Sequence, residues 1–310
     1  MDRKKEHITE FEGLKVDYEG YQNFLSKFKK LINWFLHKFG IEIKRYSSIN
    51  DYTSEFYSYH TNIDLINRRV KKINTAFNPF NNIIFKKSID ERIKNIHQYF
   101  ELIKSSPVKI DGGGLGILNG LKLFIATKEI NPDYIIESGV WRGFSSFIFN
   151  AASHDNTKIF SFDINLNKLV YKESEKITFY EEDWFRKISR MNISKDRTLL
   201  FFDDHFPHSK RLIEAKKLGF KNIIFDDNYP IDQIFIDGWP PVPTIDMCMD
   251  DMCLKITNLT WLKNNNKYHG TWNSEELKYC RSLIKRKIDF PSLYKECGYQ
   301  PGSKMTYVEI

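Results

Sequence analysis

Two short stretches of the sequence crowd acidic, amide and imidazole side chains together, each directly after an apolar run. The first stretch holds Asp203, Asp204, His205 and His208, and the second holds Asp226, Asp227 and Asn228. Neighbouring carboxylates repel one another unless a cation neutralises them. Oxygen ligands from two loops, with positions left for water and substrate, suit Mg²⁺ or another hard divalent cation. The alternatives are a helix cap at Asp204 or Asp227 and a zinc site at His205 and His208.

A second group of residues indicates a nucleoside site. An earlier apolar run ends in Glu137 and leads into Gly139 and Gly143, which let the backbone turn tightly and approach a ligand. Ser145 or Ser146 is expected to cap the helix that follows, whose amino end attracts negative charge.

The next two apolar runs also end in acidic residues. Asp163 is placed to accept hydrogen bonds from both hydroxyls of a ribose, as in dinucleotide-binding folds. Asp183 would accept from an adenine amino group, and Trp184 would stack on the ring. Each acid alone is equally well explained as a solvated loop carboxylate, but three of them in register at successive strand ends indicate a bound nucleoside.

These residues need a sheet to bring them together. The apolar runs are short, regularly spaced and separated by helical or polar stretches, at 134–137, 158–162, 177–180, 198–202, 222–225 and 305–310. Strands that alternate with helices predict βαβ units and a parallel sheet, with the last run as an edge or inserted strand. In such α/β sheets ligands bind at the carboxyl ends of the strands, so the sequence predicts a Rossmann-like sheet flanked by helices.

Residues 134–165 resemble the cofactor half of a class I S-adenosylmethionine-dependent methyltransferase. The pattern E-x-G-x-x-x-G-x-S followed by D-I-N is similar to the catechol O-methyltransferase group. GVWRG-x-S with a later D-D is similar to the macrocin (TylF-like) and cephalosporin-hydroxylase-like groups, several of which methylate sugars. The resemblance covers about 110–230, extends to 310 with the closing strand, and implies a class I methyltransferase sheet with S-adenosyl-L-methionine and Mg²⁺ as cofactors.

The resemblance also implies a role for each matching residue. The loop around the methionine part of the cofactor would comprise Glu137, Gly139, Trp141, Gly143 and Ser145. Asp163 would bind ribose, and Asp183 with Trp184 would bind adenine. The metal ligands would be Asp203 or Asp204, together with Asp226 and Asp227 or with Asp227 and Asn228.

One departure from the catechol pattern concerns the catalytic base. The lysine expected three residues after the first metal ligand is missing, because Phe206 or Pro207 stands there. His205 is the first candidate for the base and His208 the second, since an unperturbed imidazole titrates near pH 6.5. The alternative at both positions is a structural histidine.

The sequence therefore predicts a metal-assisted O-methyltransferase that acts on a hydroxyl of a small polyhydroxylated acceptor. A sugar or glycan is the first choice and a phenolic natural product the second. One alternative is an RNA methyltransferase, although no RNA-binding motif is found. Others are a non-catalytic protein with a vestigial cofactor fold, and a nucleotide-binding oxidoreductase, for which the G-x-G-x-x-G spacing is missing.

The net charge of +7 is concentrated in the first third of the chain. Residues 1–110 hold 20 Lys and Arg against 13 Asp and Glu, which leaves 27 of the 47 basic and 27 of the 40 acidic residues for 111–310. Apolar spacing predicts amphipathic helices at 20–40 and 88–104, the second capped by Ser88 with Glu91 in a capping box. We expect a basic, mainly helical accessory region at 1–106 and a methyltransferase domain at 107–310.

The remaining composition bounds the setting of the protein. Four Cys without a C-x-x-C pair do not indicate a disulfide scaffold or a structural zinc site. No signal sequence or transmembrane run is recognised, so a soluble cytoplasmic protein is expected. Nucleic acid is not an expected partner, whereas a homo-oligomer and peripheral membrane contact of the N-terminal region stay open.

Overall fold

The computed structural model describes residues 63–81, 84, 87–109, 114–172, 174–236, 240–263, 266–297 and 302–310, and two short strands, β1 (Glu10–Phe11) and β2 (Leu14–Lys15). The chain divides into a unit of residues 1–47 and a larger unit of residues 48–310. The helix expected at 20–40 lies outside the described residues.

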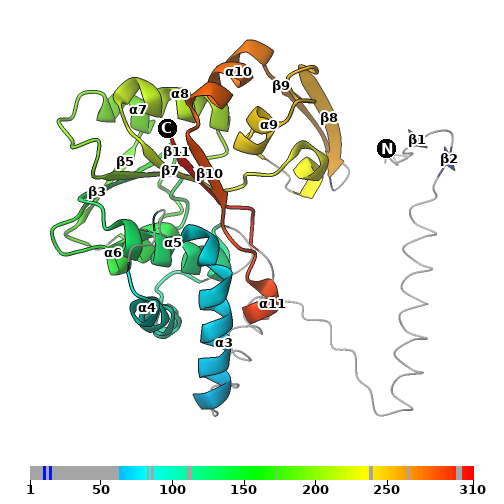
Figure 1. Ribbon diagram of the computed structural model, residues 1–310. Helices are drawn as coiled ribbons and strands as arrows, with labels where there is room; N and C mark the ends of the chain where they lie inside the picture. The colour runs from blue at the N-terminus through cyan, green and yellow to red at the C-terminus, as the bar shows by residue number, and fades with distance from the viewer. Residues whose placement is uncertain are drawn as a thin grey trace, which may run out of the picture. The chain divides into compact units, whose positions relative to one another are not determined.

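A seven-stranded sheet forms the centre of the larger unit, in the order β10-β11-β7-β6-β3-β4-β5 (Figure 1). Its strands are β3 (Tyr134–Ser138), β4 (Lys158–Asp163), β5 (Ile177–Glu181), β6 (Thr198–Phe202), β7 (Asn222–Phe225), β10 (Arg286–Asp289) and β11 (Thr306–Glu309). Strands β3 to β7 pair in parallel, and β11 is inserted antiparallel between β7 and β10. All six strands expected from the sequence are present, and the predicted Rossmann-like α/β sheet flanked by helices is confirmed.

The central strands bury both faces, which explains why they read as continuous apolar runs rather than alternating ones. Successive side chains point to opposite faces of a strand. In β6, Leu199 and Phe201 enter one core cluster, while Leu200 and Phe202 enter the other. Buried on both sides, these strands are held in one register.

Helices cover both faces of the sheet (Figure 1). One core cluster packs the sheet against α3 (Ile63–Ala76), α4 (Ile89–Leu102), α5 (Gly116–Ile130) and α6 (Phe144–Ala152). The other packs it against α7 (Trp184–Ile188), α8 (His208–Leu218), α9 (Ile245–Met249) and α10 (Ser274–Leu283). The hairpin of β8 (Asn258–Lys263) and β9 (Asn266–Thr271), α9, α10, β10 and the short helix α11 (Tyr294–Cys297) were not foreseen from the sequence.

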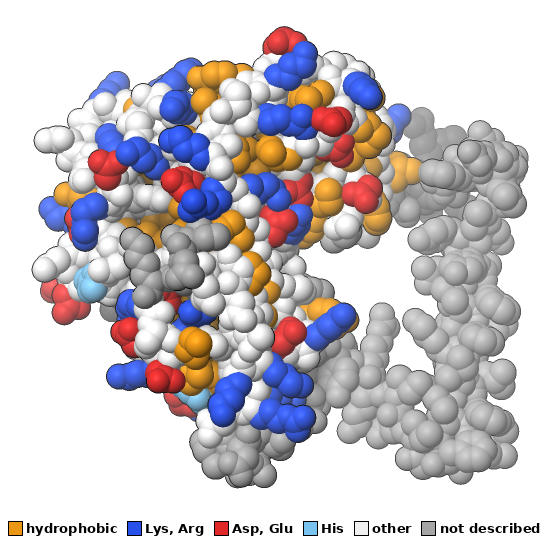
Figure 2. Space-filling view, viewed as in Figure 1, with side chains coloured by type: hydrophobic (Ala, Val, Ile, Leu, Met, Phe, Trp, Pro, Cys, Tyr) orange, Lys and Arg blue, Asp and Glu red, His pale blue; other side chains and the backbone are white. Residues whose placement is uncertain are grey.

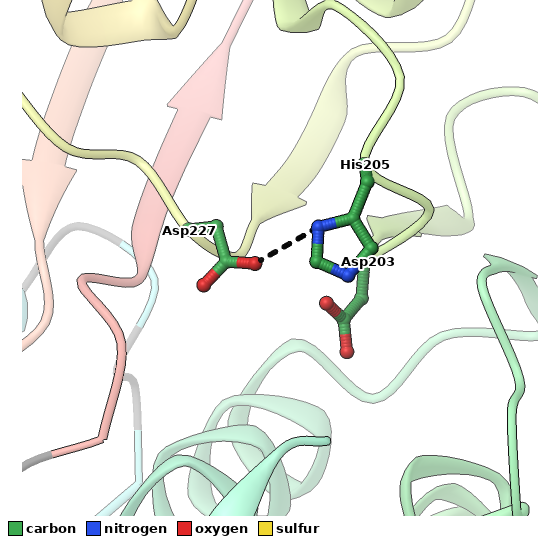
Figure 3. Close-up of side chains that lie close together, drawn as sticks. All are labelled: Asp203, His205 and Asp227. Atoms are coloured by element: carbon green, nitrogen blue, oxygen red, sulfur yellow. Dashed lines mark ion pairs between the residues drawn. The ribbon is translucent and has the colours of Figure 1, made fainter. Parts of the chain in front are cut away.

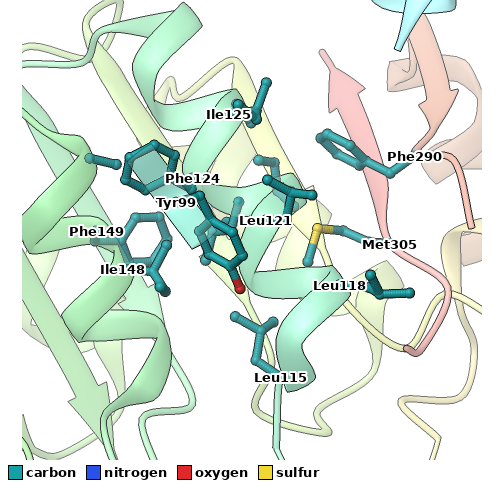
Figure 4. Close-up of a cluster of buried hydrophobic side chains, with 14 of the residues drawn as sticks. Tyr99, Leu115, Leu118, Leu121, Phe124, Ile125, Ile148, Phe149, Phe290 and Met305 are labelled. Carbon is teal, nitrogen blue, oxygen red and sulfur yellow. The ribbon is translucent and has the colours of Figure 1, made fainter. Parts of the chain in front are cut away.

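The helix predicted at 88–104 is confirmed as α4, and the Oγ of its N-cap Ser88 accepts a hydrogen bond from the Glu91 N–H at 3.2 Å. Its fully buried Tyr99 donates to the Ile117 carbonyl at 2.5 Å and packs against Phe124, both in α5 (Figure 4). Helices α3 and α4 therefore share a core with the sheet. The structural division at 47/48 differs from the boundary expected near 106, which followed the charge and motif pattern and not the packing.

The surface of the described residues carries charges of both signs (Figure 2). Lys and Arg side chains gather at the lower end of the face in view (Figure 2). In α3, Arg68, Lys71 and Lys72 are exposed. Of the helices that the structure describes, none is both long and apolar enough to cross a bilayer.

We predict that Tyr99→Ala lowers the free energy of unfolding by about 3–5 kcal/mol, because it removes a fully buried aromatic ring. The unit should still unfold in one step in urea, followed by circular dichroism and tryptophan fluorescence, since α4 and the sheet share one core. Tyr279→Ala, at an exposed residue of α10, is the matched control and should change stability by less than about 0.5 kcal/mol. Two separate transitions, of which only one moves, would contradict a shared core.

Candidate active site

A pocket of about 600 Å³ opens at the carboxyl ends of β3, β4, β5 and β6. Parallel strands end at a common edge, so the loops that follow them meet there. The residues expected from the sequence that line this pocket are Gly139, Trp141, Ser145, Asp163, Asp183, Asp203, Asp204 and His205. The remaining expected residues, Glu137, Gly143, Trp184, His208, Asp226, Asp227 and Asn228, are not among its lining residues.

The loop after β3 is shaped by two glycines. Gly139 has φ +95°, and a Cβ there would lie 2.2 Å from the carbonyl oxygen of Asp203. Gly143, with φ +86°, is the N-cap of α6. Only a residue without a side chain allows the loops after β3 and β6 to approach so closely.

Asp163 is held by this same loop. Its Oδ2 accepts hydrogen bonds from the backbone N–H groups of Val140 and Trp141 at 2.8 and 2.9 Å. The Asp163 carboxylate therefore lies at the pocket wall, between the glycine loop and the end of β4, where the expected ribose contact would be made.

Glu137 is fully buried and is not among the residues that line the pocket. Its Oε2 accepts hydrogen bonds of 2.6 Å from the hydroxyls of Ser146 in α6 and Ser161 in β4. Burial raises the pKa of this carboxyl group, while hydrogen bonds from serine hydroxyls oppose the rise. The expectation that Ser145 or Ser146 caps α6 is wrong, since the helix begins at Phe144 and has no side-chain cap. Through these hydrogen bonds Glu137 connects β3 with α6 and β4, and so supports the loop between β3 and α6.

Asp183 and Trp184, the two residues expected to bind adenine, lie in different environments. Asp183 lies at the pocket wall, where its Oδ1 caps α7 by accepting from the Phe185 N–H at 3.0 Å. Trp184 is fully buried and its ring packs against Phe202 and Phe220. Because α7 turns this indole into the core, Trp184 does not reach the pocket.

Asp203, His205 and Asp227 come together across the ends of β6 and β7 (Figure 3). One potential ligand atom from each lies within 4.8 Å of the others, and His205 Nδ1 is 3.5 Å from Asp227 Oδ2. His205 and Asp227 have φ values of +55° and +52°, a strained conformation for residues with side chains. Such strain clusters at functional sites, where the surrounding structure maintains it.

The electrostatics of this group fit a cation. Burial, followed by the charges of Asp226 and Asp227, raises the pKa of Asp203 well above its usual range. A divalent ion would relieve this repulsion, and carboxylate oxygens from two loops are ligands that Mg²⁺ accepts. The residues present therefore fit a divalent cation held by Asp203 and Asp227.

The other expected metal ligands have different neighbours. Asp204 Oδ2 accepts from Ser138 Oγ at 2.6 Å and pairs with Arg211 at 2.8 Å. Asp226 Oδ1 accepts from Asn119 Nδ2 at 2.9 Å and from the hydroxyl of Ser303 at 2.5 Å.

Asn228 is also tied into the fold. It donates to Asp246 at 3.0 Å and to Thr306 at 2.6 Å, and its own Oδ1 accepts from the Asp246 N–H at 2.9 Å. The structure therefore brings Asp203 and Asp227, but not the other three expected ligands, to the cluster with His205.

His208 lies in the core. It is 2% exposed, and its ring centre is 4.6 Å from that of Phe225. Burial and the charge of His205 lower its pKa to about 3. A neutral, buried imidazole of this kind is poorly suited to take up a proton at neutral pH, which leaves His205 as the candidate base.

Sequence reasoning missed Arg211 and Asn119. Arg211 lies in the first turn of α8 and lines the pocket beside Asp183 and Asp204. A basic residue seven positions after an acidic one is not a motif, and Asn119 is 107 positions from its partner Asp226. No local signal identified either residue.

Comparison with known proteins yields structural likenesses alone. No protein-family model and no curated protein matches the sequence. A putative O-methyltransferase from Klebsiella pneumoniae is 11% identical with a TM-score of 0.39, covering 75% of this chain and 94% of its own. The O-methyltransferase TomG from Streptomyces achromogenes, solved in complex with SAM, is 10% identical with a TM-score of 0.40, covering 77% and 97%.

An O-methyltransferase from Bacillus cereus in complex with SAH is 11% identical with a TM-score of 0.36, covering 78% of this chain and 99% of its own. Because all three TM-scores are below 0.5, the architecture and the site described above rest on the strand order and geometry of this chain itself.

We predict that Gly139→Ala is more destabilising than Gly219→Ala. Both glycines have a positive φ, +95° and +83°, but at Gly219 the nearest atom to an added Cβ is Lys195 Cγ at 3.8 Å. Gly219→Ala should therefore cost only the backbone strain of about 1–2 kcal/mol. Gly139→Ala adds a backbone clash and should cost about 2–5 kcal/mol in urea unfolding. Equal losses would contradict the close approach of the two loops.

We also predict that His208 makes the protein less stable in acid. Its folded-state pKa of about 3 lies below the unfolded value of 6.5, so its contribution to stability is present above pH 6.5 and is lost as the pH falls from 6.5 toward 3. The slope should reach about 1.4 kcal/mol per pH unit. His208→Gln should remove this slope in denaturation at pH 7 to 5, and His154→Gln, at an exposed residue, should keep it. An unchanged slope in His208→Gln would show that the imidazole is not buried in its neutral form.

Proposed function

We propose that this chain is an S-adenosylmethionine-dependent, divalent-metal-assisted O-methyltransferase. The observation that carries the proposal is the convergence of Asp203, His205 and Asp227 beside a pocket that also contains the glycine loop and Asp163. A candidate cation site and a candidate nucleoside site would thus share one edge of the parallel sheet, which supports transfer of a methyl group to a metal-bound hydroxyl.

The proposed cofactor contacts follow the pocket wall. The loop of Gly139, Trp141 and Ser145 would border the methionine part, Asp163 would bind the ribose hydroxyls, and Asp183 lies where an adenine amino group would be bound. Gly143 and Glu137 support this loop from positions outside the pocket lining. The substrate site would lie where the pocket meets the acidic cluster.

The remaining catalytic roles are proposed for His205, Asp203 and Asp227. When bound, S-adenosylmethionine supplies the methyl group and a divalent cation lowers the pKa of an acceptor hydroxyl. His205 takes the proton from that hydroxyl, with Asp227 at 3.5 Å to orient its ring. Asp203 and Asp227 would hold the cation next to His205, and positioning of the acceptor hydroxyl at this cluster would supply much of the acceleration.

The acceptor that best suits this arrangement is a small polyhydroxylated molecule such as a sugar, free or within a glycan. Two carboxylates with room for further oxygen ligands favour vicinal hydroxyl groups over a single one. A panel of sugars, catechols and an RNA oligonucleotide, each tested with radiolabelled cofactor, discriminates among the acceptor classes. Transfer to sugars is expected, while transfer confined to the RNA would replace the proposal by an RNA methyltransferase.

We predict that Mg²⁺ raises the unfolding temperature of the wild-type chain and that EDTA reverses this. At a Mg²⁺ concentration 100-fold above its dissociation constant the gain in stability should be about 2.7 kcal/mol. Asp203→Asn and Asp227→Asn should each remove most of the gain and most of the methyl transfer. Asp232→Asn, at an exposed residue, is the control and should retain both.

Calorimetric binding of S-adenosylhomocysteine tests the cofactor independently of the metal. Binding that survives in EDTA, together with loss of turnover in Asp203→Asn and Asp227→Asn, is the expected pattern. If neither S-adenosylmethionine nor S-adenosylhomocysteine binds, the proposed function is wrong. Full activity of both Asp variants would refute the metal role alone.

A further inference from the structure

Arg211 joins the loops that follow β5 and β6 at the wall of the pocket. Its guanidinium nitrogens lie 2.8 Å from carboxylate oxygens of Asp183, Asp204 and Glu214, and the residue is only 4% exposed. Asp204 also accepts a 2.6 Å hydrogen bond from Ser138 at the end of β3. One planar cation therefore connects the carboxyl ends of three strands.

The same guanidinium stacks on an aromatic ring. Arg211 Cζ lies 4.3 Å from the ring centre of Phe206, which is 39% exposed and lines the pocket. The Phe206 N–H also donates to Asp204 Oδ1 at 3.1 Å, so backbone and ring are fixed by the same network. Lys210 approaches this ring at 5.6 Å from an exposed position. A cation stacked on a ring restricts the orientation of that ring.

Arg211 is surrounded by carboxylates that favour its charged form. Burial alone would lower its pKa, but the carboxylates of Asp204, Glu214 and Asp183 raise it. A lysine could not replace the contact, because only the planar fork of an arginine can bond several carboxylates and stack on a ring at the same time.

Three aromatic residues line the pocket, Trp141 in the loop after β3, Phe144 at the start of α6 and Phe206 in the loop after β6. Trp184 is buried in the core, and Trp141 packs so closely over Gly114 that an added Cβ there would lie 2.8 Å from its ring. Of the pocket-lining aromatic residues, Phe206 is the one whose ring contacts Arg211, which in turn bonds Asp183 at the end of β5.

We propose that Arg211 is a positioning residue of the cofactor site, which holds Phe206 as the wall on which the adenine ring stacks. This inference rests on the proposed function, because it takes the pocket to contain a nucleoside. It moves the aromatic contact expected at Trp184 to the loop after β6, and it makes Arg211 the common partner of Asp183 and Asp204.

The test compares dissociation constants for S-adenosylhomocysteine and for 5′-methylthioadenosine, which carries the adenine without the amino-acid part. Phe206→Ala and Arg211→Met should weaken both by about 5- to 100-fold, the range for loss of one base–aromatic stack. Arg211→Lys should fail to restore binding. The matched control is Arg281→Met, which removes an arginine bound to Asp251 at 2.7 Å and to the Cys248 carbonyl, and it should bind both compounds within about twofold of wild type.

Two results would overturn the inference while the proposed function stands. The first is wild-type affinity for 5′-methylthioadenosine in Phe206→Ala, a variant of a partly exposed residue that decides the question even if Arg211→Met does not fold. The second is full recovery in Arg211→Lys. The Mg²⁺-induced rise in unfolding temperature should persist in Phe206→Ala, which separates a wall for adenine from general damage to the site. If the wild-type chain binds neither compound, the proposed function and this inference are both overturned.

Discussion

The structure depends on how carboxylates are accommodated where five parallel strands end at one edge. Burying a charged carboxylate is costly unless donors or a cation surround it. Most of the acids here have dedicated partners inside the fold: serine hydroxyls for Glu137, loop amides for Asp163, Arg211 for Asp183 and Asp204, and Asn119 with Ser303 for Asp226. Asp203 and Asp227 lie in one cluster with His205, where one potential ligand atom from each is within 4.8 Å of the others. This mutual proximity distinguishes the two carboxylates from the other acids at this edge.

The arrangement of these carboxylates depends on the close packing of the loops after β3 and β6. A residue larger than glycine at position 139 would collide with the backbone of Asp203. The left-handed backbone at His205 and Asp227 turns their side chains toward one another across β6 and β7. The sheet below tolerates such strain because its strands are buried on both faces and held in register by two core clusters.

The fold was predictable because its signals are local. Six apolar runs, the N-cap at Ser88 and the glycines of the first loop all appear in the structure where the sequence indicated them. The elements from residue 245 onward were missed, since β8, β9 and α10 are short and partly exposed and lack the continuous apolar runs that marked the buried strands. Composition also gave no sign of the contacts by which Tyr99 and its neighbours join the sheet core.

The sequence by itself determined which chemistry is available: a glycine loop and an acidic residue at each strand end, brought to one edge by the topology of a parallel sheet. Only the tertiary structure decided which of these carboxylates lie in the cluster with His205. Trp184, His208 and Asn228 have side chains chemically suited to the roles expected of them. In the structure, however, Trp184 and His208 are buried in the core. Asn228 donates hydrogen bonds to Asp246 and Thr306. Arg211, which belongs to no recognisable sequence motif, forms ion pairs with Asp183 and Asp204. The physical reason is that a strand fixes where a residue emerges, whereas the direction of its side chain depends on partners far away in the chain.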